Sequence, residues 1–322
     1  MSNLVKKIQN TVFQQELLKK GDKIILAVSG GPDSVCLLDI FARLAPKYNL
    51  QLRIAHVNYG LRGADSERDE KLVRQLAEKY KMKIETLTPS PEGRGGGAMP
   101  SENELRDIRY AFFEKVRQKN KFDLVAVAHN SEDQVETFLM RVIRGAGLKG
   151  LSAMQYKSGK LIRPLLGTTR AEILNYSKSQ YLVYRTDKTN KADLFFRNKV
   201  RNKLIPYLEK NFNPKIKKTI FAAVSSIAED YSLIQELSDN ISGGKQALSV
   251  KKILKLHPAL QRRVLLKIIS EKKPGVKDVE AAHIEEITKA LKSTKNKNQI
   301  VIFKGLKMTR KGDKVIIEKL TR

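Results

Sequence analysis

Short apolar runs alternate with helical patterns along the first half of the chain. Apolar residues recur every three to four positions over residues 35–48, 66–80, 102–119 and 132–143. Between these segments lie apolar runs of strand length, at residues 24–28, 52–57, 83–87 and 124–128, with a fifth candidate at 161–165. Strands that alternate with helices predict an α/β fold with a doubly wound, mostly parallel sheet of about five strands.

The second half of the chain has a different pattern. A basic stretch at 197–210 leads into a long helical pattern at about 214–239, followed by helices around 256–271 and 278–292 and strands at 299–303 and 314–319. These elements predict a smaller α+β C-terminal domain. We expect the boundary near residue 212, which gives domains 1–212 and 213–322 joined by the long helix. The glycine-rich segment 89–100 is expected to form a loop.

A six-residue turn after the first strand carries the strongest chemical signal. It consists of Ser29, Gly30, Gly31, Pro32, Asp33 and Ser34. Glycines let the backbone approach an anion, and the free N–H groups of the first helical turn point toward it. The two serines add hydroxyl donors, and the Asp33 carboxylate can hold a metal ion. The turn predicts a phosphate site, the alternative being an ordinary glycine turn after a strand.

The sequence of this turn indicates which class of phosphate-binding motif it belongs to. It is neither the G-x-x-x-x-G-K-[ST] motif nor the G-x-G-x-x-G dinucleotide turn. The string SGGPDS instead resembles the PP-loop of the ATP pyrophosphatases, which cleave ATP between the α and β phosphates. This resemblance implies ATP as a substrate and Mg²⁺ as its companion ion, with Asp33 as the metal-linked residue.

The charge balance points to a polyanionic partner. The chain has 62 basic and 34 acidic residues, a net charge of +28. Nucleic acid is the favoured partner, and a solvated lysine-rich surface is the alternative. The charge is uneven, because residues 241–322 hold 21 basic and 7 acidic residues. This tail carries half of the net charge, which indicates an RNA-contacting module.

Composition also limits compartment and class. No apolar run is long enough for a membrane span, and the N-terminus has the pattern of an amphipathic helix rather than of a signal peptide. Cys36, the single cysteine, lies on an apolar helical face and is expected in the core. We therefore expect a cytoplasmic protein that does not bind membranes. The oligomeric state stays open, with a homodimer among the alternatives.

A second informative run, AHNSEDQVET, begins at Ala128. Ser131 and Gln134 fit a capping box, which predicts a helix start. Residues Val135, Phe138, Leu139 and Val142 form its expected buried stripe. Asp133 and Glu136 share the opposite face. They are either acids that complement the helix dipole or a carboxylate pair that binds an ammonium group or a magnesium-bound phosphate.

Polar residues follow three of the expected strands. Asn58 and His129 come directly after strands, and His56 lies at the end of one. Ligands of such sheets bind at the carboxyl ends of the strands, so these side chains and Ser29 are expected to converge on one crevice. A lone histidine is more often structural than catalytic. The spacing of the histidines offers no metal site.

Two arginines lie on the helix that Ser101 and Glu104 are expected to open with a capping box. Arg106 and Arg109 share a face of this helix beside Tyr110, and they can clamp a phosphate. Ordinary surface arginines are the alternative. The run at 141–150, RVIRGAGLKG, has two readings as well: a basic contact to nucleic acid or phosphate, or a helix end with a glycine stop.

Six motifs in order give a more specific resemblance. They are SGGPDS at 29–34, HVNYGLRGADSERDE at 56–70, ENELRDIRY at 102–110, AHNSEDQVETFLMRVIRGAGLKGL at 128–151, RPLL at 163–166 and DKTNKADLFFRNKVRNKLIP at 187–206. Together they cover the first 210 residues and resemble the tRNA(Ile)-lysidine synthetase family. The segment 256–263 resembles that family's second domain.

This resemblance implies a catalytic, ATP-binding domain at 1–212 and a tRNA-contacting domain at 213–322. The implied reaction joins free lysine to the wobble cytidine of an isoleucine tRNA with a CAU anticodon, through an adenylated cytidine. Catalysis is then assigned to Asp33, Asp133, Glu136, Arg106 and Arg197, with Arg201 as an alternative to Arg197. ATP is assigned to residues 29–34 together with His56, Asn58 and His129.

The chain departs from the family pattern at two positions, since Tyr59 and Asn130 stand where many members have histidine. Three alternative functions remain to be weighed, two of them enzymatic. A PP-loop thiolase needs paired cysteines, which disfavours it here, and an amidotransferase-coupled synthetase needs a glutaminase domain. A basic RNA-binding protein that keeps a nucleotide fold would bind tRNA without releasing AMP.

Overall fold

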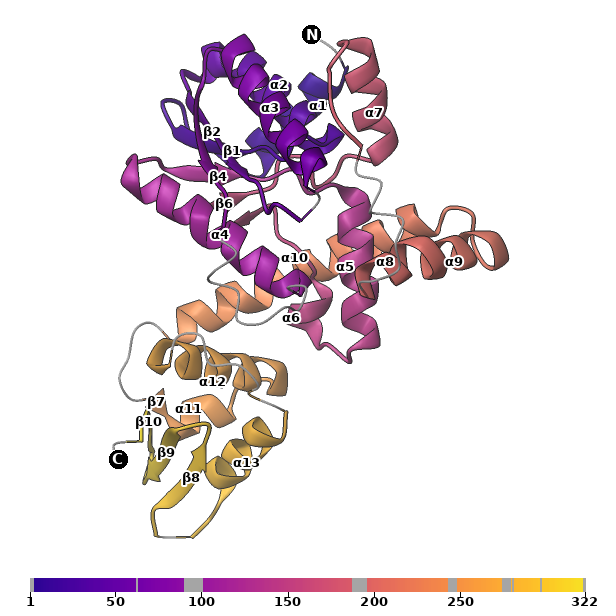
Figure 1. Cartoon of the computed structure of the whole chain (residues 1–322). Helices are drawn as coiled ribbons and strands as arrows, with labels where there is room; N and C mark the ends of the chain where they lie inside the picture. The colour runs from indigo at the N-terminus through magenta and orange to yellow at the C-terminus, as the bar shows by residue number, and fades with distance from the viewer. Residues whose placement is uncertain are drawn as a thin grey trace. The chain divides into compact units, whose positions relative to one another are not determined.

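The computed structural model describes residues 3–61, 63–89, 101–186, 196–242, 248–273, 279, 281–295 and 297–320. The chain divides into two compact units, Met1–Ser225 and Ser226–Arg322, which are described separately (Figure 1). The division falls inside helix α10, Ile216–Ser242, and therefore later in the chain than the boundary near residue 212 expected from the sequence. Among the described residues, no helix is long and apolar enough to cross a bilayer.

The first unit is built on a sheet with the strand order β3-β2-β1-β4-β6-β5. Its strands are β1 (Lys23–Ala27), β2 (Gln51–Val57), β3 (Lys83–Leu87), β4 (Leu124–Ala126), β5 (Lys157–Ser158) and β6 (Leu161–Ile162). All neighbours pair in parallel except β5 and β6. The doubly wound α/β prediction is confirmed, with six described strands rather than about five, because the edge hairpin β5–β6 adds a short antiparallel strand.

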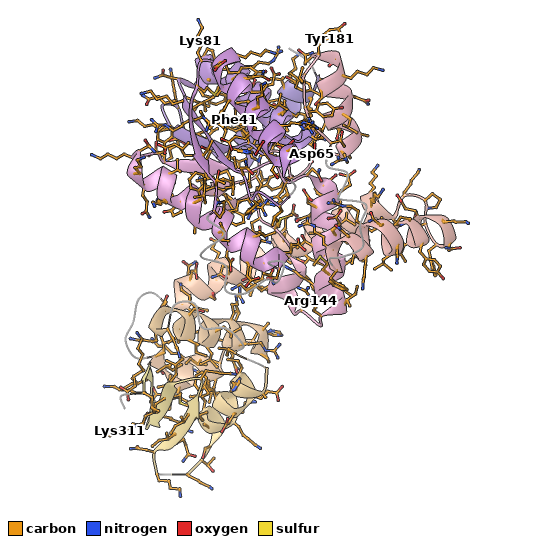
Figure 2. The ribbon with its side chains drawn as sticks, in the orientation of Figure 1. Phe41, Asp65, Lys81, Arg144, Tyr181 and Lys311 are labelled. Atoms are coloured by element: carbon orange, nitrogen blue, oxygen red, sulfur yellow. The ribbon has the colours of Figure 1, made fainter. Side chains whose placement is uncertain are left out.

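Helices cover both faces of this sheet (Figure 1). They are α1 (Asn3–Gln14), α2 (Pro32–Tyr48), α3 (Ala64–Lys79), α4 (Glu102–Lys119), α5 (Ser131–Ile143), α6 (Leu148–Leu151), α7 (Arg170–Ser179), α8 (Phe196–Lys199), the π-helical turn η3 (Val200–Leu204) and α9 (Ile205–Asn211). Successive side chains of a strand point to opposite faces. Ile24 and Leu26 accordingly pack with the α2 side, where Phe41 is fully buried (Figure 2), and Ile25 packs toward α4.

Two predicted strands end earlier than their apolar runs. Strand β4 ends at Ala126 and β6 at Ile162, whereas the sequence placed them at 124–128 and 161–165. After Ala126, the chain keeps one further bond, from the Val127 N–H to the Ile162 carbonyl. It then turns toward Asn130, which caps α5. The polar end of the sheet therefore starts directly beside a helix N-terminus, which is the position where ligands of parallel sheets bind.

The second unit contains an antiparallel sheet with the order β7-β10-β9-β8. Its elements are β7 (Leu248–Ser249), α11 (Val250–Leu254), α12 (Pro258–Lys272), α13 (Ala281–Lys292), β8 (Gln299–Phe303), β9 (Leu306–Lys311) and β10 (Lys314–Lys319). The smaller α+β unit and strands β8 and β10 are confirmed. The hairpin β8–β9 turns at Lys304 and Gly305, both at positive φ, as a two-residue turn requires.

Candidate active site

The phosphate turn lies between the end of β1 and the start of α2. Gly30 has a φ of +89°, which a residue with a Cβ adopts only with strain. Gly31 caps α2 and Pro32 occupies its first turn, where the missing N–H costs nothing. Among the described residues, the Asp33 and Ser34 N–H groups have no acceptor. The turn thus has the unpaired backbone donors that an anion needs.

The two serines of this turn bond to the turn itself. The Ser34 hydroxyl donates to the Gly31 carbonyl at 2.9 Å and accepts from the Ser29 N–H at 3.1 Å. The two hydroxyl oxygens are 3.1 Å apart. These bonds hold the loop in shape, and each hydroxyl keeps capacity for a further partner.

Asp33 is the ionisable group of the turn. One oxygen, Oδ2, accepts from Arg170 Nη1 at 3.2 Å, whereas Oδ1 is buried without a hydrogen-bond partner. Burial raises the pKa of Asp33 to about 6, although the Arg170 guanidinium pulls it the other way. A buried carboxylate oxygen with no donor is a fitting ligand for Mg²⁺, which needs one or two protein carboxylates beside substrate phosphates. The described residues contain no cluster of three or more metal-ligating side chains.

Arg170 is a residue that the sequence reasoning missed. It opens α7, and its backbone N–H donates to Glu132 Oε2 at 3.0 Å. The Ser131 N–H donates to the Thr168 carbonyl at 3.0 Å. The starts of α5 and α7 are therefore tied together, and this places the Arg170 guanidinium at Asp33. The Thr169–Glu172 capping box signals the helix start, but the sequence offers no sign of the contact with Asp33.

The start of α5 corrects one sequence prediction. Asn130 is the cap and Asp133 its reciprocal partner, with bonds of 3.1 Å and 3.0 Å, so the Ser131–Gln134 box is wrong. The Gln134 side chain instead bonds the backbone of Met154 at 2.8 Å and 2.9 Å. The predicted stripe is confirmed at Val135, which is buried, but Val142 is exposed because α5 extends beyond the packed core.

Asp133 and Glu136 share a face of α5, and two arginines cover it. Arg197 donates to Asp133 Oδ1 at 2.8 Å and to Glu136 Oε2 at 2.7 Å. Arg201, one turn later in the chain, donates to both oxygens of Glu136, at 2.5 Å and 2.9 Å. The Glu136 side chain is 1% exposed. The pair is thus far more than a set of helix-start acids, because it forms a buried network with two guanidinium groups.

Electrostatics distinguish the members of this network. Burial by itself would raise the pKa of Asp133, but the positive charges of Arg197 and Arg201 and the hydrogen bond from the Asn130 N–H outweigh it and hold that pKa below its usual value. Arg197 has a raised pKa because the two carboxylates overcome the effect of burial. Asp133 also raises the pKa of Asp33 through its charge. The phosphate turn and the carboxylate pair therefore belong to one electrostatic neighbourhood.

The three residues that follow the strands separate into two groups. His129 lies in the neighbourhood of Asp133 and Arg197, and burial lowers its pKa to about 3. Its Nδ1 atom is buried without a partner. His56 Nδ1 lies 2.8 Å from the Val28 carbonyl oxygen, and Asn58 donates to Glu70 of α3 at 2.9 Å. His56 and Asn58 therefore bond to the sheet and to α3, while His129 faces the charged site.

A cluster of arginines surrounds Tyr110 on α4. The guanidinium groups of Arg106 and Arg109 lie 5.4 Å and 6.0 Å from the Tyr110 ring centroid. The charge of Arg106 also lowers the pKa of Arg163 and of Arg141, in which burial is the larger cause. In the described part of the chain, no carboxylate pairs with these four arginines. Arg106 and Arg109 are exposed, Arg141 is half-buried and Arg163 is buried. Such an excess of cations fits a polyanionic substrate.

Arg141 and Arg163 also have structural bonds. Arg141 donates to the carbonyls of Gly150 and Ala153, at 2.7 Å and 2.8 Å, and so fixes the turn that follows α5. Arg163 donates to the Gln155 carbonyl at 2.8 Å, and its Nε is buried without a partner. The segment 141–150 therefore forms a helix end whose turn is fixed by Arg141. This role is compatible with a basic surface at the same place.

Comparisons with known proteins place this site in a family. A family model of the PP-loop domain, ATP_bind_3, matches residues 1–208. The tRNA(Ile)-lysidine synthase of Clostridium tetani is 37% identical over 299 residues, which cover 90% of this chain and 64% of that protein. The enzyme of the same name from Clostridioides difficile is 33% identical over 324 residues, covering 97% and 70%. The chain belongs to the tRNA(Ile)-lysidine synthase family.

The chain spans about two thirds of the length of these tRNA(Ile)-lysidine synthases. Among solved structures, the U34-tRNA thiolase NcsA of Methanococcus maripaludis, determined with its [4Fe-4S] cluster, aligns with a TM-score of 0.58. The two chains are 23% identical, and the alignment covers 70% of this chain and 78% of that one. This likeness shows that the PP-loop fold is shared.

Two departures from the lysidine synthase pattern have structural explanations. The Tyr59 hydroxyl donates to the Leu105 carbonyl at 2.7 Å and so ties the segment after β2 to α4. Asn130 caps α5. A tyrosine and an asparagine are good residues for these two bonds, and neither bond requires an imidazole.

Proposed function

We propose that the chain joins free L-lysine to C2 of the wobble cytidine of an isoleucine tRNA with a CAU anticodon, at the expense of ATP. The observation that carries this proposal is the adjacency of two features. A phosphate turn with unpaired N–H groups lies in the same electrostatic neighbourhood as the carboxylates Asp133 and Glu136. One feature suits ATP, and the other suits an ammonium substrate. The family supports this pairing.

In the first step, ATP is held by the turn that follows β1. The N–H groups of Asp33 and Ser34 donate to phosphate oxygens, and the dipole of α2 favours their negative charge. The free Asp33 oxygen would hold Mg²⁺, which would supply positive charge to neutralise the phosphates. The cytidine C2 oxygen then attacks the α-phosphorus. The bond to the β-phosphate oxygen breaks and pyrophosphate leaves, giving an adenylated cytidine.

The arginines beside Tyr110 serve this first step. Arg106 and Arg109 have no carboxylate partners among the described residues, so their donors are available to phosphate. Guanidinium groups bind phosphate through two parallel hydrogen bonds. We assign them to the α-phosphate and to the backbone of the tRNA. This assignment would explain why a basic cluster remains unneutralised, with the charge of Arg109 reaching His129 of the candidate site.

In the second step, Asp133 and Glu136 bind the lysine side chain. The low pKa of Asp133 suits it to holding a charged ammonium. We assign removal of the ammonium proton to Glu136, the second carboxylate of the pair. The freed ε-amine attacks C2, the C2–oxygen bond breaks, and AMP leaves. Arg197 and Arg201 occupy both carboxylates in this structure. For lysine to bind, at least one guanidinium group must therefore move away from a carboxylate oxygen of Asp133 or Glu136.

Three parts of the proposal concern the rest of the molecule. The basic second unit is assigned to tRNA contacts, on the basis of its charge. The homodimer and the cytoplasmic location stay predictions. A thiolase reaction is disfavoured, because the printed sequence has one cysteine and Cys36 is completely buried in α2.

The proposal is tested by incubating the protein with ATP, Mg²⁺, radiolabelled lysine and a CAU isoleucine tRNA transcript. We expect label in the tRNA, with one AMP released for each lysine incorporated. A transcript with uridine at the wobble position is the matched control and should take up no label. AMP release that does not depend on lysine, or label that does not depend on the wobble cytidine, would contradict the proposal.

A further inference from the structure

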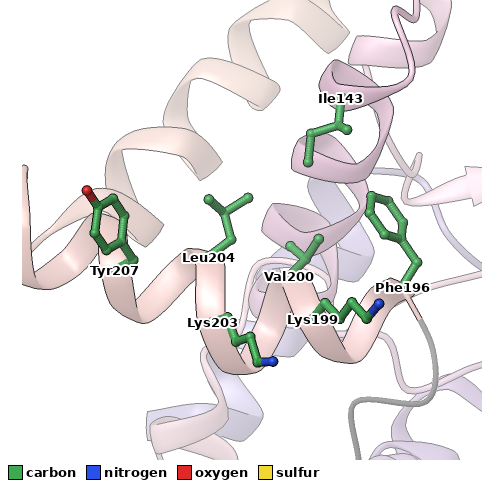
Figure 3. Close-up of a pocket in the computed structure, with 7 residues that line it drawn as sticks. All are labelled: Ile143, Phe196, Lys199, Val200, Lys203, Leu204 and Tyr207. Atoms are coloured by element: carbon green, nitrogen blue, oxygen red, sulfur yellow. The ribbon is translucent and has the colours of Figure 1, made fainter.

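The helical stretch α8–η3–α9 lines an open groove of about 420 Å³ (Figure 3). Phe196, Val200, Leu204 and Tyr207 project from it on the side of Ile143, the last residue of α5, as Figure 3 shows. Lys199 and Lys203 complete the lining. The groove therefore combines aromatic rings, an aliphatic floor and two ammonium groups, and among the described residues no acidic side chain lines it.

Contacts with α5 and with a small buried core fix the position of this stretch. Arg197 and Arg201 bind the Asp133–Glu136 pair of α5, and Val200 and Ile205 are buried in a small core with Val135. The π-helical turn η3 belongs to this stretch, and such turns are frequent at functional sites. The helical stretch that lines the groove therefore also contacts the carboxylates proposed to bind lysine.

Several rings at this surface lie open to solvent although the helix is well anchored. Tyr207 is 58% exposed, and it contacts Phe212, which is 70% exposed. Ile143 is 55% exposed. An anchored helix that leaves two aromatic rings and a branched apolar side chain in water marks a binding surface rather than an unfinished core.

Positive charge surrounds these rings. The Arg144 guanidinium lies 5.2 Å from the centroid of the Phe196 ring. Within the described residues, neither Arg144 nor Lys199 forms an ion pair. Rings beside cations that lack carboxylate partners form the surface that single-stranded nucleic acid prefers, because bases stack on the rings and phosphates contact the cations. A protein partner would instead favour a surface depleted in lysine.

We propose that this groove binds unstacked nucleobases of the tRNA anticodon loop, next to the base that is modified. Tyr207 and Phe196 provide the stacking surfaces, and Lys199 and Lys203 contact the loop phosphates. The identity of the RNA rests on the proposed function, whereas the chemistry of the groove does not. Loops are the part of RNA whose bases can be splayed out and stacked on aromatic side chains. If the groove held the bases next to the wobble base, the wobble base itself would stay beside Asp133 and Glu136.

The test measures the affinity of the full chain for a fluorescent anticodon stem-loop RNA by anisotropy. Tyr207→Ala and Phe196→Ala should each weaken binding by about tenfold, the effect of losing one stacked base. Tyr207→Phe keeps the ring and should bind within about twofold of the unchanged protein. Tyr181→Ala removes another exposed tyrosine of the same unit and serves as the matched control. Replacing both Lys199 and Lys203 with serine should reduce the salt slope by about 1.4, since each phosphate contact to a single strand contributes about 0.7.

Unchanged affinity in Tyr207→Ala and Phe196→Ala would overturn the inference. It would also be overturned if these variants changed the sedimentation of the protein and left RNA affinity intact, because the groove would then join two copies of the chain. Lysine incorporation is measured in parallel. If the unchanged protein incorporates no lysine but the variants still lose RNA affinity, the proposed function is wrong and the inference that the groove binds RNA bases is supported.

Discussion

The Nε atom of Arg197 lies 2.7 Å from Oε2 of Glu136, a side chain that is almost completely buried. The two residues are 61 positions apart in the sequence and come from α8 and α5. Arg197 also bonds Asp133, so one guanidinium joins both carboxylates of the proposed lysine site. The contact neutralises a buried charge, and it occupies the place that we propose for a cationic substrate.

Replacing Arg197 with alanine should destabilise the fold. A buried carboxylate that loses its partner typically costs about 3–5 kcal/mol, although Arg201 remains and lessens the loss at Glu136. Urea unfolding measures this change. The double variant Arg197→Ala, Glu136→Gln should recover part of the lost stability, because the uncompensated charge is gone. Equal stability of Arg197→Ala and the unchanged protein would show that the pair is not formed in solution.

Gly30 and Gly21 offer a matched pair for the phosphate turn. Both have a φ of +89°, and Gly21 lies away from the site, with open space where a Cβ would stand. Either substitution by alanine should cost about 1–2 kcal/mol of stability, since the left-handed conformation disfavours a Cβ. Only Gly30→Ala should also weaken ATP binding, as measured by calorimetry. The same loss of ATP affinity in Gly21→Ala would mean that general destabilisation causes it.

His129 should make stability depend on pH. Burial lowers its pKa to about 3, below the value of about 6.5 that it has in an unfolded chain. The unfolded state therefore binds a proton first, and stability falls as the pH drops from about 6.5 toward 3. His129→Gln should flatten the unfolding free energy measured between pH 7 and 5. Identical slopes for the variant and the unchanged protein in this window would contradict the buried, neutral state of His129.

Lysines on the second unit should contribute to tRNA affinity. Lys311 and Lys314 are exposed partners across the β9–β10 ladder, and Lys307 lies on the same face. Replacing all three with serine should raise the KM for tRNA and leave the KM for ATP unchanged. The salt dependence of tRNA binding should also become shallower, by about 0.7–0.9 for each lost phosphate contact. An equal rise in both KM values would argue against RNA contact by this face.

The sequence predicted what local patterns encode. The strand–turn–helix unit at 24–48, the Ser101–Glu104 capping box, the buried Cys36 and the helix at 102–119 are confirmed. Each depends on residues that are near one another in the chain. The family assignment is confirmed for the same reason, because its motifs are short and ordered.

The features that could not be predicted from the sequence depend on contacts between residues far apart in the chain. The Arg170–Asp33 bond joins residues 137 positions apart, and no local pattern signals it. Among the described strands, β7 pairs with β10 alone. Strand β9 has a lysine-rich sequence in which only Leu306 and Met308 are fully buried. At the start of α5, two pairs have residue types that suit a capping box, Ser131 with Gln134 and Asn130 with Asp133. The contact of Gln134 with Met154 selects the second arrangement.

The most direct measurement is mass spectrometry of the wobble nucleoside, recovered from a CAU isoleucine tRNA after reaction with the protein, ATP, Mg²⁺ and lysine. We predict a nucleoside that carries lysine at C2 of the pyrimidine, in the unchanged protein and not in Asp33→Asn. Asp33→Asn should keep the fold and its affinity for tRNA. Recovery of unmodified cytidine, or of a base carrying another group, would contradict the account.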